Sequence, residues 1–310
     1  MSKPVRKKRH ILRNVLITLI IALSLAYAYI KPQDEAPAPP PIPEGSYFEV
    51  YFLDIGQGDS VLIICDGKAM LIDGGPGGAS RKVYSFLEAH GVSHLDYIVA
   101  SHADADHVGG LSAALNYASV DTALCTVTSH NTKTFCNFVK YLKKQNVEIT
   151  VPDAGDEFSL GSARCTVIGP KQGETYSDNT SLIIRVEYGE TSFLFTGDAE
   201  YQDEQAAIES GFELSSTVLK VGHHGSSSSS SYEFLQAVKP EYAVISVAGD
   251  NSYGHPTSRS LSQLQGVGAK VLRTDMQGDI HCTSDGTSVE FDVKKNADAD
   301  TYSYSGGYLN

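Results

Sequence analysis

The nine residues from His102 to Gly110, HADADHVGG, most constrain how this chain can fold. They place two histidines and two aspartates within six positions, directly after an apolar run over residues 95–101 that predicts a buried strand. Residues 108–115 predict the start of a helix, so the polar side chains lie on the turn between the two elements. Buried carboxylates and imidazoles are costly without partners, and a divalent cation is the usual reason for gathering so many. The stretch therefore predicts a metal site rather than a solvated polar loop.

Further polar side chains follow predicted strands elsewhere in the chain. They are Asp73, Asp198 and the adjacent pair His223 and His224. Strand ends are where α/β scaffolds present reactive groups, so we expect these side chains to gather beside the 102–107 cluster. Adjacent histidines on a tight turn point in different directions, so we expect one of the pair to bind a given metal. Each position alone is as consistent with a polar strand end as with a metal ligand, but together they favour one metal site.

Short apolar runs separated by turns dominate the first part of the body, and later runs alternate with helical segments. This order predicts two packed sheets flanked by helices, an αββα sandwich of the α+β class. An apolar fraction of 41% is enough to fill such a core. The predicted helices cover residues 81–90, 137–144, 202–209, 232–237 and 258–266.

Residues 1–30 differ in kind from the rest of the chain. Six Lys or Arg residues precede an apolar stretch over residues 15–30, which predicts either a membrane anchor or a signal peptide. The sequence Ala-Tyr-Ala at 26–28 fits a signal-peptidase site, so both alternatives stay open. The basic flank would stay in the cytoplasm, which places the remainder outside it in either case. The membrane is then an expected partner through this segment.

Two other segments are expected to flank the folded body, which we place at residues 47–294. Residues 31–46 are rich in proline and lack aromatic side chains, so we expect a stiff linker. Residues 295–310 combine small and polar residues, which predicts a disordered tail.

The chain is strongly acidic once the N-terminal segment is set aside. Seven of the 24 basic residues lie in the first 31 positions, which hold no acid, so 17 bases face 37 acids in residues 32–310. This formal charge of −20 disfavours tight non-specific binding of long duplex DNA. It leaves room for one phosphodiester held by metal ions or by a local basic patch.

Seven short stretches of the body occur together in an order typical of one known family. They are FLDIGQGDS from Phe52, LIDGG from Leu71, HADADHVGG from His102, DNTSL from Asp178, FTGD from Phe195, LKVGHHGS from Leu219 and YGHP from Tyr253. In these stretches the chain resembles the metallo-β-lactamase superfamily, and within it the extracellular hydrolase domain of ComEC-type competence proteins. The resemblance covers residues 47 to about 292. It implies the αββα fold and a centre for two divalent ions, Zn²⁺ or Mn²⁺.

The resemblance also implies how the ligands divide between the two ions. His102 and Asp104 would serve one ion, while Asp106 and His107 would serve the other. Asp198 would bridge both. Two cations that share a hydroxide and clamp an in-line displacement supply a nucleophile at neutral pH.

The remaining roles are carried over in the same way. His224 stands just before a glycine and is the expected last ligand, in preference to His223. Asp106 would also orient the hydroxide, and His223 or His255 would act as general acid. Asp73 is expected to orient the ligand loop from behind the metal ligands.

Two positions depart from the commonest superfamily pattern, and ComEC-type domains share both departures. Position 104 is Asp where His is usual, and no histidine stands near Asp178 and Asn179, where another His ligand is usual. An oxygen-rich site that is poor in imidazole favours harder ions such as Mn²⁺ over Zn²⁺. Asp178 or Asn179 is expected to complete that site.

These observations predict an exported or membrane-anchored metal-dependent phosphodiesterase or nuclease, acting on single-stranded DNA or on another phosphodiester. One hydrophobic segment is present, so we expect a role in competence to need a separate channel protein. A cell-envelope hydrolase of choline or teichoic-acid phosphoesters is an alternative that the acidic body favours. A non-catalytic binding module that kept the fold is another, although the full ligand set argues against it.

Overall fold

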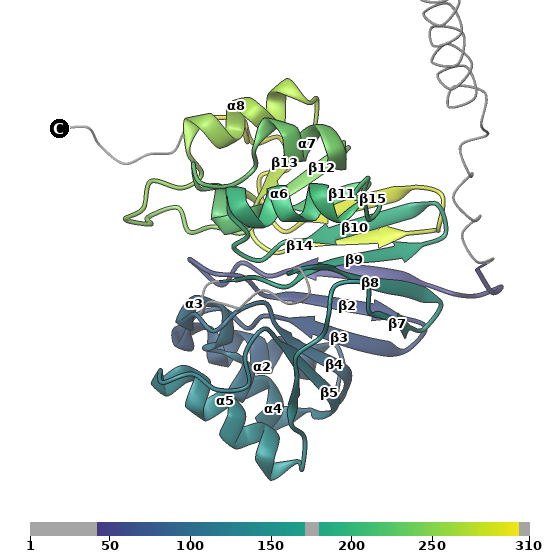
Figure 1. Ribbon diagram of the computed structural model, residues 1–310, viewed down its shortest axis with the longest axis vertical. Helices are drawn as coiled ribbons and strands as arrows, with labels where there is room; N and C mark the ends of the chain where they lie inside the picture. The colour runs from purple at the N-terminus through teal and green to yellow at the C-terminus, as the bar shows by residue number, and fades with distance from the viewer. Residues whose placement is uncertain (1–41, 171–179, 304–310) are drawn as a thin grey trace, which may run out of the picture. The chain divides into compact units, whose positions relative to one another are not determined.

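The computed structural model describes residues 42–170 and 180–303, which form two facing sheets with helices on their outer sides (Figure 1). The first sheet has eight strands. Its early strands pair antiparallel, whereas β3 to β6 pair in parallel because helical segments connect them. Its order is β15 (Val289–Val293), β14 (Ile280–Ser284), β1 (Phe48–Phe52), β2 (Val61–Cys65), β3 (Lys68–Ile72), β4 (His94–Ala100), β5 (Ser119–Cys125) and β6 (Ile149–Thr150).

The second sheet has seven strands and repeats this arrangement. Antiparallel pairs join β7 to β10, and parallel pairs join β10 to β13. Its order is β13 (Lys270–Arg273), β12 (Tyr242–Ile245), β11 (Val218–Lys220), β10 (Thr191–Phe195), β9 (Ile183–Tyr188), β8 (Ala163–Gly169) and β7 (Glu157–Leu160).

Amphipathic helices cover the outer face of each sheet (Figure 1). One helix shows the pattern clearly, because it buries Phe135, Phe138 and Leu142 at helical spacing and exposes lysines elsewhere. The αββα sandwich predicted from the sequence is therefore confirmed. The helices over the first sheet are α2 (Ser80–Ala89), α4 (Leu111–Tyr117) and α5 (Lys133–Lys144), and those over the second are α6 (Tyr201–Ser210), α7 (Tyr232–Val238) and α8 (Ser258–Gly266). Shorter helical turns are η1 (Gly77–Ala79), α3 (Ala105–Val108), η2 (Gly222–Gly225) and α9 (Thr274–Gln277).

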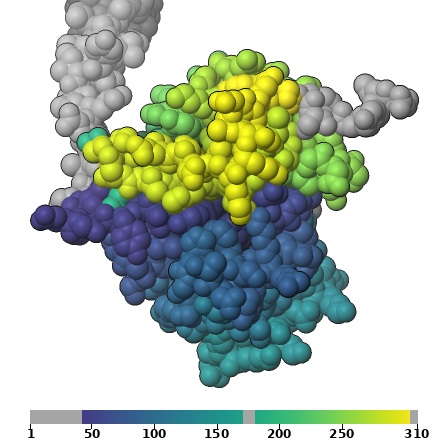
Figure 2. Space-filling model, turned by 180° about the vertical axis from the view of Figure 1, so that it is seen from behind, coloured from purple at the N-terminus to yellow at the C-terminus, as the bar shows by residue number. Residues whose placement is uncertain are grey.

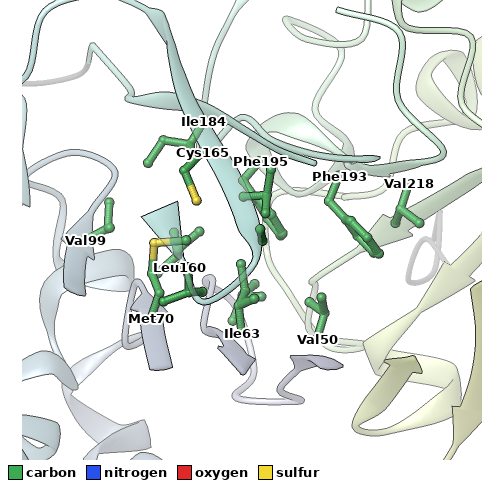
Figure 3. Packing of buried hydrophobic residues seen from close by; sticks show 14 of the residues in the cluster. Val50, Ile63, Met70, Val99, Leu160, Cys165, Ile184, Phe193, Phe195 and Val218 are labelled. Atoms are coloured by element: carbon green, nitrogen blue, oxygen red, sulfur yellow. The ribbon is translucent and has the colours of Figure 1, made fainter. Parts of the chain in front are cut away.

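The main hydrophobic core lies between the two sheets (Figure 3). In β1, the inward side chains Phe48, Val50 and Phe52 are fully buried and alternate with less buried ones. They meet Phe193 and Phe195 of β10, with ring centroids 5.0 Å apart for Phe48 and Phe193. Burying each such side chain contributes about 1.5–3 kcal/mol, so this layer fixes how the two sheets face each other.

The C-terminal part of the body returns to its start. β14 pairs antiparallel with β1, and Figure 2 shows the yellow C-terminal segment beside the purple N-terminal one. Beyond β15 the chain stays packed, because the buried guanidinium of Arg273 donates to the carbonyls of Thr301 and Ser303 at 3.3 and 2.7 Å. Within the segment that we expect to be a disordered tail, Thr301 and Ser303 thus contact the folded body through their carbonyl groups, and Arg273 also pairs with Asp275 at 2.7 Å.

Of the N-terminal segments that we predicted, the structure describes only the end of the linker, from residue 42. Ile42, which we assigned to the linker, packs against the main core. The expected anchor or signal peptide at 1–30 lies outside the described residues. Among residues 42–170 and 180–303, no helix is long and apolar enough to cross a membrane.

The helix expected from residue 108 is divided into α3 and α4 at Gly109 and Gly110. A Cβ on Gly110 would lie 2.0 Å from the carbonyl oxygen of Gly74, so only glycine permits this contact. Through this contact, the loop after β3 packs directly against the turn after β4. Two of the loops that carry candidate ligands are thereby held together by backbone contact.

Candidate metal centre

The candidate ligands lie on loops that leave the carboxyl ends of strands in both sheets. β3 and β4 are parallel neighbours, so Asp73 and the 102–107 turn emerge side by side. β10 and β11 are parallel neighbours in the other sheet and bring Asp198 near His224. The backbone N–H of Leu182 donates to the carbonyl of Ser101 at 2.8 Å and links the two sheets at this edge.

Four of the predicted ligands converge on one point. Asp106, His107, Asp198 and His224 each offer one ligand atom, and these atoms lie within 4.8 Å of one another. Nε2 of His107 is 3.2 Å from Oδ1 of Asp198, and Nε2 of His224 is 3.7 Å from the same oxygen. Nε2 of His224 is also 3.6 Å from Oδ2 of Asp106. The two histidines are buried, whereas the side chain of Asp106 is 37% exposed.

Buried atoms at this point lack hydrogen-bond partners among the described residues. They are Nε2 of His107, Nε2 of His224 and Oδ1 of Asp198. Leaving a buried polar atom unpaired costs about 1–3 kcal/mol, so three together need an explanation. Two imidazole nitrogens and a carboxylate oxygen that face one point fit a divalent cation.

A second group of side chains faces the other oxygen of Asp198. Oδ2 of Asp198 is 4.0 Å from Nε2 of His102 and 3.7 Å from Nε2 of His223. Nε2 of His102 is also 3.6 Å from Oδ2 of Asp104. The carboxylate of Asp198 therefore lies between two groups, as a bridging ligand would. Asp178 and Asn179 lie outside the described residues, so their predicted contribution stays a prediction.

The imidazoles and carboxylates perturb one another's protonation. Burial acts to lower the pKa of His224, but the carboxylates of Asp198 and Asp59 outweigh it and raise this pKa to about 9. Burial acts to raise the pKa of Asp198, but His107 and His224 hold it well below its usual range. A divalent cation would displace these imidazole protons, because His binds metals in its neutral form.

Asp73 lies behind one candidate ligand, His107, and contacts it. Its carboxylate accepts hydrogen bonds from the backbone N–H of Ser101 at 2.8 Å and from the Ser101 hydroxyl at 2.7 Å. The same carboxylate lies 2.9 Å from Nδ1 of His107. A carboxylate can only accept, so the proton is on Nδ1 and Nε2 is free to face the cluster.

Backbone conformation separates the two adjacent histidines. His223 and His224 both adopt left-handed backbone angles, with φ of 48° and 54°. Their rings diverge by 73°, so only His224 enters the buried cluster. Nδ1 of His224 donates to the carbonyl of Ser246 at 2.9 Å, which leaves Nε2 for a metal. Of the two histidines, His224 is therefore the one in the candidate metal cluster.

The comparison with known families now decides the classification. Residues 53–249 match the model of the metallo-beta-lactamase superfamily. The chain belongs to the metallo-β-lactamase superfamily. The match includes the 102–107 turn, Asp198 and His224, so the fold and the candidate ligands fall in one matched region.

Individual relatives agree with this membership of the superfamily. The chain is 32% identical to ComE operon protein 3 of Bacillus subtilis (strain 168) over 251 residues, covering 75% of this chain and 32% of that protein. It is 33% identical to competence protein ComA of Neisseria gonorrhoeae over 240 residues, covering 73% and 30%. The chain thus spans about a third of the length of the curated relatives it matches. The metallo-beta-lactamase fold protein YhfI of Bacillus subtilis has the same fold, with a TM-score of 0.51, 12% identity and coverage of 79% of this chain and 100% of that one.

Behind the ligands, this member of the superfamily carries a charge pair that we did not predict. Nζ of Lys220 lies 2.6 Å from Oδ2 of Asp59, and both side chains are almost fully buried. Oδ1 of Asp59 lies 3.3 Å from Nδ1 of His224. Burial alone would raise the pKa of Asp59, but Lys220 and His224 outweigh it and lower this pKa to about 2. A single lysine within the apolar strand β11 was the available signal, because such a side chain needs a buried partner.

The turn that carries Asp59 also supports the ligand loop. A Cβ on Gly58 would lie 2.2 Å from the backbone oxygen of Asp106, and the φ of Gly58 is 140°. The backbone N–H of Asp59 donates to that same oxygen at 3.3 Å. The glycine in the GQGD stretch therefore permits backbone contact with the loop that presents Asp106.

A cavity of about 800 Å³ opens beside the centre, and His102, Asp104, Asp198, His223 and Arg259 are among the residues that line it. Of the two predicted general acids, His223 is the one that lines this cavity. Nδ1 of His223 lies 3.1 Å from Oε1 of Glu200, which turns its Nε2 toward Asp198.

The other predicted general acid, His255, stands farther back. Its ring lies 5.6 Å from the ring of His223, centroid to centroid. Burial and the neighbouring His223 and His224 lower the pKa of His255 to about 4, so its imidazole is neutral at pH 7. A neutral imidazole is a weak proton donor, so the structure favours His223 over His255 for this role.

Proposed function

We propose that this superfamily member, a metal-dependent hydrolase, is an exported or membrane-anchored phosphodiesterase or nuclease with a two-metal centre. The observation that carries the proposal is the position of Asp198, whose two oxygens face two separate groups of side chains. Two ions joined by such a carboxylate suit the in-line displacement of a phosphodiester. The resemblance to competence proteins and the oxygen-rich group around Asp104 favour this substrate class over a β-lactam.

We assign the candidate ligands to two ions. His107, His224 and Asp106 would hold one ion, and His102 and Asp104 would hold the other, with Asp198 shared. Bound ions would supply a nucleophile from water at neutral pH and neutralise the phosphodiester charge. The other contributions to the reaction would come from His223 in the cavity and from Asp73 behind His107.

His223 would move the proton of the leaving group. Oε1 of Glu200 lies 3.1 Å from Nδ1 of His223 and also accepts from the hydroxyl of Ser228 at 2.7 Å. Because Nδ1 of His223 faces this carboxylate, Nε2 is the atom that faces the centre and would donate the proton to the leaving oxygen. Asp73 keeps the proton of His107 on Nδ1, so that ligand stays available at Nε2.

The test uses the full chain purified in mild detergent, stripped of metal and supplied with Mn²⁺ or Zn²⁺. We expect turnover of a single-stranded oligonucleotide and of bis-p-nitrophenyl phosphate, and little turnover of nitrocefin. Asp106→Ala should abolish turnover, whereas Asp121→Ala, at an exposed carboxylate outside the centre, should leave it unchanged. Absence of phosphodiester turnover with either metal, or full activity of Asp106→Ala, refutes the proposal. Turnover of the small substrate without the oligonucleotide would instead support the cell-envelope hydrolase.

A further inference from the structure

We infer that Tyr253 forms a subsite beside the metal centre that stacks on an unpaired nucleobase of a single-stranded nucleic acid. This inference rests on the proposed phosphodiesterase function and names the substrate class. It concerns the loop between β12 and α8, which the assignment of metal ligands does not use.

Tyr253 is an exposed aromatic side chain on a fixed loop. Its relative exposure is 69%, which by itself is ordinary for a surface tyrosine. The loop beneath it is held by one side chain, because Asn251 donates to the carbonyls of Ala248 and His255, both at 2.7 Å. Its amide oxygen also accepts from the backbone N–H groups of Tyr253 at 3.1 Å and His255 at 3.0 Å. A ring held in place before binding loses little conformational entropy when a ligand binds.

A short series of rings connects Tyr253 to the metal centre. The Tyr253 ring stacks on His255, with centroids 5.7 Å apart and planes inclined by 26°. His255 meets His223 edge-on at 5.6 Å, and Nε2 of His223 is 3.7 Å from Asp198. His255 thus supports one face of the tyrosine, and 69% of the side chain remains exposed. A flat group attached to a phosphodiester at the centre is the partner that this geometry fits.

The surroundings of Tyr253 suit a nucleobase. A cavity of about 590 Å³ borders the ring, and it is lined by Gln57, Asn251 and Ser252 among others. Gln57 accepts from the backbone N–H of Ala248 at 3.2 Å, which ties this loop to the turn after β1. Among the residues lining this cavity, Tyr253 is the one aromatic side chain. A quaternary ammonium group such as choline is usually held by several aromatic rings, so a single supported face favours a planar base.

The charge of the chain points to stacking as the source of affinity. Residues 32–310 carry 17 Lys or Arg against 37 Asp or Glu, so this part of the chain attracts the negatively charged backbone of a nucleic acid only weakly. Base stacking on an aromatic ring needs no positive charge and tolerates any base sequence. It does need an unpaired base, because the bases of a duplex already stack on one another. A single strand is thus the form of nucleic acid that this subsite accepts.

The experiment compares an oligothymidylate with an abasic oligonucleotide of the same length and charge, using the full chain with Mn²⁺. In Tyr253→Ala we expect KM for the oligothymidylate to rise about tenfold, which corresponds to ~1.4 kcal/mol. We expect kcat to stay unchanged, and KM for the abasic strand to stay unchanged. Tyr253→Phe should behave as the unaltered chain. Tyr232→Ala is the matched control, because Tyr232 is 54% exposed and lines neither cavity.

Several outcomes overturn the subsite. Equal KM values for Tyr253→Ala and the unaltered chain on oligothymidylate do so, as does an equal loss on both strands. A selective loss on p-nitrophenylphosphocholine would assign the ring to a choline group instead. Binding of a fluorescein-labelled oligothymidylate, measured by anisotropy with metal present, separates the two proposals. If the unaltered chain binds this probe in a Tyr253-dependent way without cleaving it, the proposed function fails and the subsite stands.

Discussion

Replacing Lys220 by methionine tests whether the buried charge pair behind the candidate metal centre stabilises the fold. The ammonium of Lys220 lies 2.6 Å from Asp59, and the two side chains are 2% and 4% exposed, so water cannot screen the charge that remains. Removing one partner of a buried ion pair costs roughly 3–5 kcal/mol, because the other charge stays buried and unpaired. His224 lies 3.3 Å from the other oxygen of Asp59 and compensates in part, so we take the lower end, about 3 kcal/mol.

The assay is thermal unfolding of the metal-free chain at pH 7. For a folded unit of this size, 1 kcal/mol corresponds to roughly 2–4 °C, so Lys220→Met should lower Tm by about 6–12 °C. The double variant Lys220→Met with Asp59→Asn should recover much of this loss, because it also removes the buried charge. The control is Lys68→Met, which breaks a pair of similar length, 2.8 Å, whose lysine is 55% exposed. We expect its Tm to stay close to that of the unaltered chain.

Two results would refute this reasoning. One is a Tm for Lys220→Met within the range of the Lys68→Met control, which would mean that burial adds nothing to the pair. The other is a double variant less stable than Lys220→Met alone, which would mean that the charge left on Asp59 is not the cause of the loss.

Three further predictions concern the centre and one surface turn. Asp73→Asn should weaken metal binding by roughly 10–100-fold, measured by competition with a chelating dye, because an amide has one acceptor oxygen and cannot accept from both the Ser101 N–H and Nδ1 of His107; unchanged affinity would exclude this role. Gly58→Ala should reduce both metal affinity and Tm, because its Cβ would clash with the backbone of Asp106; normal values for both would show that the loop yields freely. The backbone N–H groups of Ser288 and Thr287 lower the pKa of Asp285 from 3.8 to about 2, so its contribution to stability is present above pH 3.8 and lost as pH falls through about 2. Urea unfolding of Asp285→Asn should therefore show a stability gap to the unaltered chain at pH 7 that closes between pH 4 and 2, and a gap that is constant with pH would contradict this.

Much of the fold follows from local pattern. The alternation of Phe48, Val50 and Phe52 gives a strand with one face in the core, and the spacing of Phe135, Phe138 and Leu142 gives a helix with one buried side. Such patterns depend on neighbours in the sequence, so they can be recognised without knowing which elements meet. The tail is different, because residues 295–303 have no apolar pattern, and contacts such as those of Thr301 and Ser303 with Arg273 join them to distant parts of the chain.

The candidate ligands were also predictable, for a chemical reason. His102, Asp104, Asp106 and His107 are of types that seldom gather on a short buried turn unless a cation holds them. Asp198 and His224 share this chemistry at other strand ends. The sequence indicates that these groups belong together, but it does not say which oxygen of Asp198 faces which histidine.

By itself, the sequence determined the αββα class, and it predicted the types of the candidate ligands and the pair of histidines that would supply one of them, because these depend on residue type and local spacing. Only the tertiary structure decided which side chains from distant segments meet. The pairing of β10 with β11 sets Asp198 beside His224, and packing between the sheets brings Lys220 to Asp59. Likewise, the left-handed turn of η2 decides that His224 enters the cluster while His223 faces the cavity. These contacts follow from strand register and packing across the core, which no short stretch of sequence encodes.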